Sequence, residues 1–194
     1  MITEVTEIIN PPKAGRSTRR SYSKAPSILH HVVLIGCSKT KQTELFEGTD
    51  RQMTGRYRCQ QMYGGALFHK GVAYAESRGL LWYALSAKYG VWGKHTELKP
   101  YDYTFDDMVK AERLAWHTAV AHRLVEELWE PFHQHQKDEA IEPSQLVVEI
   151  HAGKDYCHPL AELLDLVGIR CILPLEGLEI GERLKWYKDQ ETAK

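Results

Sequence analysis

Four polar segments of the sequence carry side chains suited to chemistry. Ser38, Lys41 and Lys88 supply hydroxyl and ammonium donors that fit phosphate or carbonyl oxygens, and Gly36 and Gly153 allow turns that expose backbone N–H groups. Each segment directly follows a short apolar run. The segments are GCSKTK from residue 36, SAKYG from 86, HAGKDY from 151 and PLEG from 174.

A fifth segment, PYDYT at residues 100–104, places a carboxylate between aromatic rings. Asp102 just before a predicted helix start is suited to orient water or to stabilise a developing positive charge. The alternative is that Asp102 only caps a turn. Tyr89, Tyr101 and Tyr156 in neighbouring loops fit stacking on a planar ring, or they are core aromatics.

Other features of the sequence limit the chemistry. Cys37 is either a nucleophile or a small buried apolar residue, and the four cysteines form no C-x-x-C pair. The sequence has no H-E-x-x-H, no G-x-x-x-x-G-K-[ST] and no G-x-G-x-x-G, so we expect no metal and no cofactor.

The elements that must position these residues follow from apolar patterning. Apolar runs predict strands at residues 31–35, 80–85, 146–150 and 170–173. Helices are expected at 60–77, from the Thr104-x-x-Asp107 capping box to Pro131, from Pro159 to Gly168, and at 179–188. This alternation indicates a three-layer α/β fold, a mostly parallel sheet with helices on both faces. Ligands bind beyond the carboxyl ends of such strands, so the polar segments should meet there.

Length and composition indicate a single core. With 194 residues, 43% hydrophobic and 26% charged, the chain is typical of one globular domain. Residues 1–27 are proline-containing and basic without apolar periodicity, which predicts a flexible arm. Residues 28–194 then form one α/β catalytic domain. No apolar run is long enough to span a membrane and no secretory signal is visible, so a cytoplasmic location is expected.

Charge is unevenly distributed along the chain. Between residues 51 and 99, eight basic residues stand against two acidic ones, and between 104 and 149 four basic residues stand against ten acidic ones. The asymmetry predicts a positive face for an anionic polymer. The alternative is that these charges intermix on the folded surface.

The segments GCSKTK, LSAKYG, LKPYDYT, HAGKDY and PLEGLEIG together resemble a family of bacterial and phage domains. Its pattern is GCS-x-x-K, LSAKYGL, PYD, AG-x-x-Y and PL-x-GL-x-IG, and the resemblance covers about residues 32–187. The family is distantly similar to the peroxide-stress protein YaaA and to uracil-DNA-glycosylase-like folds. One member is an antiphage DNA glycosylase that acts on glucosylated hydroxymethylcytosine.

The resemblance implies a uracil-DNA-glycosylase-like fold and base excision from modified phage DNA, with an abasic site as product. Asp102 would then stabilise the cationic sugar, and Lys88 would stabilise the departing base. The substrate-binding residues would be Cys37, Ser38, Lys41, Ser86, Tyr89, Tyr101, Gly153 and Tyr156. Three alternatives stay open: a non-catalytic DNA-binding stress-response protein, a nucleotide or nucleoside hydrolase, and a Schiff base on lysine in place of activated water. The oligomeric state is not predicted.

Overall fold

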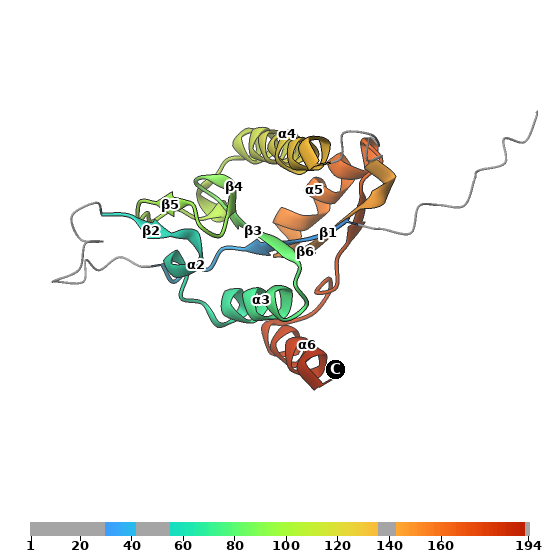
Figure 1. The fold of residues 1–194 in the computed structure, drawn as a ribbon. Helices are drawn as coiled ribbons and strands as arrows, with labels where there is room; N and C mark the ends of the chain where they lie inside the picture. The colour runs from blue at the N-terminus through green and yellow to red at the C-terminus, as the bar shows by residue number, and fades with distance from the viewer. Residues whose placement is uncertain (1–29, 42–54, 136–142, 193–194) are drawn as a thin grey trace, which may run out of the picture.

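The computed structural model describes residues 30–41, 55–135 and 143–192, with the backbone alone described from 128 to 135. The predicted arm at 1–27 lies outside the described residues. The central sheet has the strand order β4-β3-β1-β6-β7 (Figure 1). Its strands are β1 (His30–Gly36), β3 (Leu81–Ser86), β4 (Gly90–Gly93), β6 (Leu146–His151) and β7 (Arg170–Ile172).

The central strands are apolar because the sheet is covered on both faces. β1 pairs in parallel with β3 on one side and with β6 on the other, and β6 pairs in parallel with β7. Strands buried on both faces become continuous apolar runs. The predicted α/β class with a mostly parallel sheet and flanking helices is confirmed.

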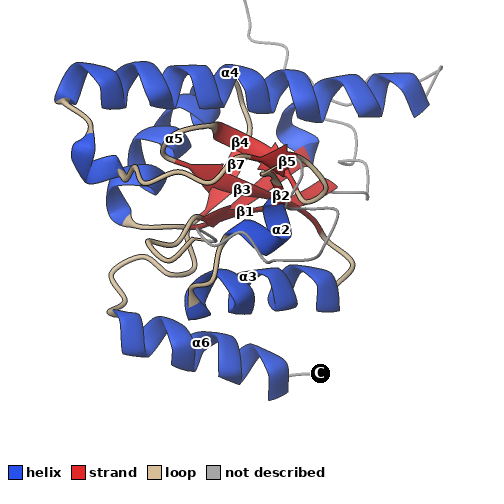
Figure 2. Cartoon of the chain, turned by 90° about the vertical axis from the view of Figure 1, so that its left-hand side faces the viewer, coloured by secondary structure: helices blue, strands red, loops and turns tan. Residues whose placement is uncertain are grey.

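Helices form the outer two layers of the fold (Figure 2). α4 (Lys110–His135) and α5 (Lys154–Leu166) cover one face of the sheet, and α3 (Ala66–Ser77) covers the other, with α6 (Ile180–Thr192) packed beside it. Alternate residues of a strand point to opposite faces. Accordingly, Leu34 packs with the core on the α4 and α5 side, and Ile35 packs with the core on the α3 side.

Two features of the sheet region were not predicted. β4 runs antiparallel to β3, because the segment SAKYG makes a tight turn that ends at Gly90, whose φ of 78° favours glycine. A separate two-stranded sheet pairs β2 (Tyr57–Arg58) with β5 (Glu97–Leu98). We call residues 55–63 and 94–99 the β2–β5 lobe.

The helix predicted at residues 60–77 is split into two. α2 (Cys59–Met62) ends before Tyr63, and α3 begins at Ala66. Glycine disfavours helix, and the Gly64 N–H donates to the Thr40 carbonyl at 2.9 Å instead of to a helical partner. The Ser38 hydroxyl holds Gly65, the residue after Gly64. Its Oγ accepts from the Gly65 N–H at 3.1 Å and donates to the Thr40 carbonyl at 2.5 Å. The break therefore ties the start of α3 to the segment after β1.

The long helix begins later and ends later than predicted. The Thr104 and Asp107 capping box is present, but it opens the 3-10 turn η1 (Phe105–Asp107), and α4 starts only at Lys110. The Glu112 carboxylate caps that start by accepting from the Val109 N–H at 2.9 Å. α4 then continues past Pro131 to His135, because a proline can kink a helix without ending it.

Helix α5 begins five residues earlier than predicted and carries Pro159 inside it. A proline has no N–H, so the Asp155 carbonyl four residues earlier loses its helical donor. The Nε2 of His117, a buried residue of α4, lies 2.9 Å from that carbonyl oxygen and takes the place of the missing donor. The predicted C-terminal cap is confirmed at Gly168, whose φ is 84°.

A buried polar network joins the sheet to α6. The His151 Nε2 lies 2.7 Å from the Glu149 Oε1, and the His151 Nδ1 lies 2.6 Å from the Tyr187 hydroxyl. A carboxylate only accepts, so the His151 Nε2 donates its hydrogen bond to Glu149. Burial raises the pKa of Glu149, but the hydrogen bonds from His151 and Tyr74 and the charges of His151 and His31 outweigh it and hold that pKa below its ordinary 4.5.

This network predicts a specific acid sensitivity. A carboxyl whose pKa is lowered in the folded state stabilises the fold above its ordinary pKa, and the contribution disappears as the pH falls through the folded pKa. Glu149→Gln should therefore lower the free energy of unfolding by about 1–3 kcal/mol at neutral pH. The difference from wild type should shrink at a pH below 4.5, measured by urea unfolding. An equal difference at both pH values would contradict this role.

The junction between Ser38 and Gly65 predicts a strict need for glycine. A Cβ built at Gly65 would overlap the Cβ of Ser38, whereas a Cβ at Gly181 in α6 meets no described heavy atom within 4 Å. Gly65→Ala should destabilise the fold by about 1–3 kcal/mol through overpacking. Gly181→Ala, the matched control, should be neutral or stabilising by up to about 1 kcal/mol. The denaturant midpoints of the two variants test this prediction. Equal midpoints would show that the Ser38 segment moves aside without cost.

Candidate functional site

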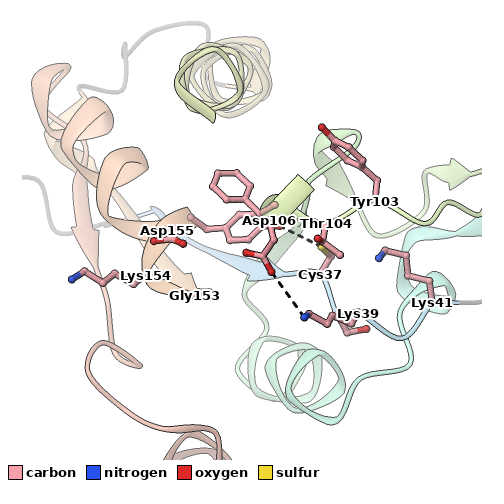
Figure 3. Close-up of a pocket in the computed structure, with 12 residues that line it drawn as sticks. Cys37, Lys39, Lys41, Tyr103, Thr104, Asp106, Gly153, Lys154 and Asp155 are labelled. Atoms are coloured by element: carbon pink, nitrogen blue, oxygen red, sulfur yellow. Dashed lines mark hydrogen bonds and ion pairs between the residues drawn. The ribbon is translucent and has the colours of Figure 1, made fainter. Parts of the chain in front are cut away.

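A cavity of about 290 Å³ lies beyond the carboxyl ends of β1 and β6 (Figure 3). Its volume is at the lower end for ligand pockets. Three chain segments form it: the loop after β1, the residues around η1, and the start of α5. The lining residues are Cys37, Ser38, Lys39, Lys41, Tyr103, Thr104, Phe105, Asp106, Gly153, Lys154, Asp155 and Tyr156.

The parallel register of the two central strands brings these distant segments together. Leu34 pairs with Ile150 and Ile35 with His151, so the next residues of both strands leave the sheet at the same edge. A Cβ at Gly36 would lie 3.1 Å from the Cβ of Ala152. The two segments thus approach closely before they separate to form the cavity.

An aromatic pair lines the cavity on the α4 side. The rings of Phe105 and Tyr156 lie 4.2 Å apart between centroids, tilted by 36°, and Trp116 supports Phe105 from behind at 5.2 Å. The Tyr156 hydroxyl lies 3.9 Å from the Cys37 Sγ. Burial and the nearby Cys37 raise the pKa of Tyr156, so this hydroxyl stays protonated. The pair contributes aromatic rings to the cavity lining.

Two carboxylates line the cavity, and sequence reasoning selected neither. Asp106 is exposed and lies 4.0 Å from the Lys39 ammonium, and Asp155 lies 3.8 Å from the Arg113 guanidinium. Figure 3 shows Asp106 facing Lys39, with Asp155 on the α5 side. The signal for Asp155 was its place inside HAGKDY. Asp106 had a weaker signal, two residues beyond the capping Thr104.

Lys41 is a buried lysine whose side chain lines the cavity. It is 9% exposed, and its ammonium lies 4.6 Å from the centroid of the Tyr101 ring. Its backbone forms an isolated bridge with Tyr63. The sequence singled out Lys41, but nothing in the pattern predicted that it would be buried.

A chain of hydroxyl groups holds Tyr101 in place behind Lys41. The Tyr101 hydroxyl lies 2.8 Å from the Ser86 Oγ and 3.1 Å from the Tyr63 hydroxyl, and the Tyr89 N–H donates to the Ser86 Oγ at 3.0 Å. Burial raises the pKa of Tyr101. The cavity lining does not include Ser86, Tyr89 and Tyr101, which support Lys41 from behind.

The two residues selected as catalytic lie outside the cavity lining. Asp102 is exposed and, within the described part of the chain, forms no hydrogen bond or ion pair. Lys88 is exposed as well, with its ammonium 5.5 Å from the Tyr89 ring centroid and 5.8 Å from that of Tyr101. Neither position tests the assigned roles, which stay predictions.

The expected meeting of polar segments is therefore only partly realised. The lining includes GCSKTK and HAGKDY, together with the end of PYDYT, while SAKYG supports the wall from behind. The segment PLEG lies elsewhere: Glu176 lies 2.8 Å from His158 and lines a separate hollow of about 150 Å³ with Lys154 and Arg183. The strand before PLEG is at the edge of the sheet, which accounts for the separation.

The described residues offer neither a metal cluster nor a membrane-spanning helix. No group of three or more His, Cys, Asp or Glu side chains among them is arranged to hold a metal ion. None of the described helices combines the length and the apolar character needed to span a membrane.

Comparison with known proteins places this chain in a family. The model of a family described as "Family of unknown function (DUF6884)" matches residues 32–189. No curated protein and no solved structure matches the chain. The matched region contains every residue that lines the cavity. It also contains the whole central sheet except the first two residues of β1. The chain therefore belongs to the DUF6884 family of unknown function.

Proposed function

We propose that this protein is a DNA glycosylase that hydrolyses the N-glycosidic bond of a modified base and leaves an abasic site. Glucosylated hydroxymethylcytosine in phage DNA is the substrate that the sequence resemblance suggests. The observation that carries the proposal is the cavity itself, which carboxylates, ammonium groups and aromatic rings line together. An enzyme acting on a base in duplex DNA must receive the extruded base in such a pocket.

The lining chemistry suits cleavage of a glycosidic bond. The transition state carries positive charge on the sugar and negative charge on the departing base. A carboxylate stabilises the first and a hydrogen-bond donor the second. Asp106 and Asp155 supply carboxylates, and Lys39 and Lys154 supply donors, around a space that fits a single nucleoside-sized group.

Asp106 is the carboxylate that we assign to the sugar. It is in the cavity lining and exposed, so it reaches a ligand without breaking a core contact. Its ion pair with Lys39 is also exposed at 4.0 Å, and such pairs contribute little to stability. Asp102, four residues earlier, remains the alternative suggested by the sequence.

Unpaired cations beside the cavity support a nucleic-acid substrate. Arg58, Lys94 and Lys99 of the β2–β5 lobe form no ion pair with any described residue, and Arg58 and Lys99 are exposed. On the helices, by contrast, Arg113 and Arg123 are paired with carboxylates. Unpaired cations gathered in one lobe attract a polyanion such as the DNA backbone.

The proposal predicts a large kinetic effect at Asp106. Asp106→Asn keeps the shape and removes the charge, so base release from DNA with modified cytosines should fall at least about 100-fold. The melting temperature should change little because the side chain is exposed. Single-turnover release, followed by mass spectrometry of free bases, measures the effect. Asp189→Asn on α6 is the matched control and should be as active as wild type.

The same assay separates the competing assignments. A loss confined to Asp102→Asn would give the role to Asp102, and wild-type rates in both variants would exclude both carboxylates. Lys88→Ala should release base more slowly and leave an unbroken abasic strand. Strand breakage that disappears in Lys88→Ala would instead indicate a Schiff base. Binding of modified DNA without any base release would favour the non-catalytic DNA-binding alternative.

The β2–β5 lobe predicts how DNA affinity depends on salt. Removing one cation that neutralises a phosphate should lower the slope of log K against log salt by about 0.9. The triple variant Arg58→Gln, Lys94→Gln, Lys99→Gln should therefore show a clearly smaller slope than wild type. The matched triple variant on α3 and α6 replaces Lys70, Lys185 and Lys188 with Gln and should keep the slope. Fluorescence anisotropy on duplex DNA measures both, and equal slopes would remove the lobe from the interface.

A nucleotide or nucleoside hydrolase is the second candidate, because a cavity of about 290 Å³ holds a free nucleoside as well as an extruded one. The base-release assay with free nucleotides in place of DNA distinguishes the two. Base release from free nucleotides but not from DNA would identify the protein as a nucleotide or nucleoside hydrolase.

A further inference from the structure

We infer that the cavity binds a phosphate group of its substrate, and that the Lys41 ammonium is the group that holds it. The inference deepens the proposed function, since it rests on a nucleotide being the substrate of this cavity. In this arrangement the phosphate binds at Lys41, and the base binds at the rings of Phe105 and Tyr156.

The burial of Lys41 without an ion pair to a described carboxylate is the first argument. Lysine is almost never buried unless it is paired, yet Lys41 is 9% exposed and forms no ion pair with a described residue. The nearby carboxylates have other partners. Asp106 lies next to Lys39, and Asp107 accepts from the Thr104 N–H at 2.6 Å.

The Tyr101 ring compensates the Lys41 charge only in part. A cation over an aromatic ring gains electrostatic attraction, but it does not regain the hydrogen bonds that water gave its three N–H groups. The Lys41 ammonium lies 4.6 Å from the ring centroid and lines the cavity. These N–H groups have no acidic partner among the described residues, so we expect them to bind a ligand in the cavity.

The Lys41 backbone and the ring beside its ammonium are held in place before a ligand arrives. The Lys41 backbone bridges to Tyr63, and the Thr40 carbonyl before it accepts from the Gly64 N–H. The ring beneath the ammonium is fixed by the Ser86 and Tyr63 hydroxyls. A prepositioned charge loses little side-chain entropy on binding, which favours affinity.

The field across the cavity has the sign that an anion requires. α5 has 13 residues, and its N-cap Gly153 lines the cavity without supplying a side-chain cap, so the positive end of the helix dipole lies at the cavity. Figure 3 shows Gly153 and Lys154 on the side opposite Lys41. Three lysines line the cavity against two aspartates, and the helix end adds to that excess.

Phosphate is the anion that this arrangement fits. A lysine acts as a point charge toward phosphate, whereas carboxylates are more often recognised by the planar fork of arginine, and no arginine lines the cavity within the described residues. The phosphate comes either from the DNA strand, as a diester beside the extruded nucleotide, or from a free nucleotide, as a monoester. Both sources share the same chemistry at Lys41.

Two measurements test the inference on the full-length protein. Calorimetry compares deoxycytidine monophosphate with deoxycytidine. The phosphate should improve binding at least about tenfold in wild type and in the control Lys185→Met, an exposed lysine of α6 outside the cavity lining, and should lose that advantage in Lys41→Met. Lysine labelling with an amine-reactive acetylating reagent needs no variant. Inorganic phosphate should slow acetylation of Lys41 and leave the exposed Lys188 unchanged.

The source of the phosphate is read from the labelling experiment. Protection by a short oligodeoxynucleotide but not by deoxycytidine monophosphate identifies the diester, and the reverse identifies the monoester. Equal affinity for nucleoside and nucleotide, together with unprotected Lys41, would overturn the inference even if base release from DNA proves the proposed function. Protection of Lys41 in a protein that releases no base would support the inference and remove the glycosylase proposal.

Discussion

The parallel pairing of β1 with β6 is the constraint on which the site depends. It places two segments more than a hundred residues apart at the same edge of the sheet, in the register Ile35 to His151. A Cβ at Gly36 would lie 3.1 Å from the Ala152 Cβ, which is tighter than an ordinary contact. Everything that lines the cavity either continues from these two strands or packs against their ends, and α5 begins there because β6 ends there.

Polar groups inside the fold hold elements in position rather than carry chemistry. On the α3 side, Glu149 and His151 fix Tyr187 and with it α6. Behind the cavity, the Ser86 and Tyr101 hydroxyls form a similar support. Buried polar groups are stable only when they are hydrogen-bonded, and such networks specify one arrangement. Lys41 differs from these groups, because this 9% exposed lysine forms no ion pair with a described residue, and we infer a ligand for it.

The charge asymmetry of the sequence has a structural counterpart. Cations of the β2–β5 lobe are without ion-pair partners among the described residues, whereas the charges of α4 partly neutralise each other, as Arg123 and Glu127 do at 3.2 Å one helical turn apart. Pairs within a helix remove charge from the long-range field, and unpaired cations keep it. The lobe and the cavity are linked through Lys41, whose bridge partner Tyr63 belongs to the lobe.

The sequence by itself determined the local features of this protein. Apolar runs located the four parallel strands, and local hydrogen-bonding residues marked the Thr104 capping box and the Gly168 cap, because these depend on near neighbours in the chain. Polar segments after β1 and β6 were also recognisable, since strand ends position ligand sites in this fold class. Tertiary contacts decided the rest. Pro159 is inside a helix only because His117 supplies a donor from another helix. Likewise, Asp106 lines the cavity where Asp102 does not, and Lys41 is buried, because both depend on how η1 and the lobe pack against the sheet, which no spacing along the chain encodes.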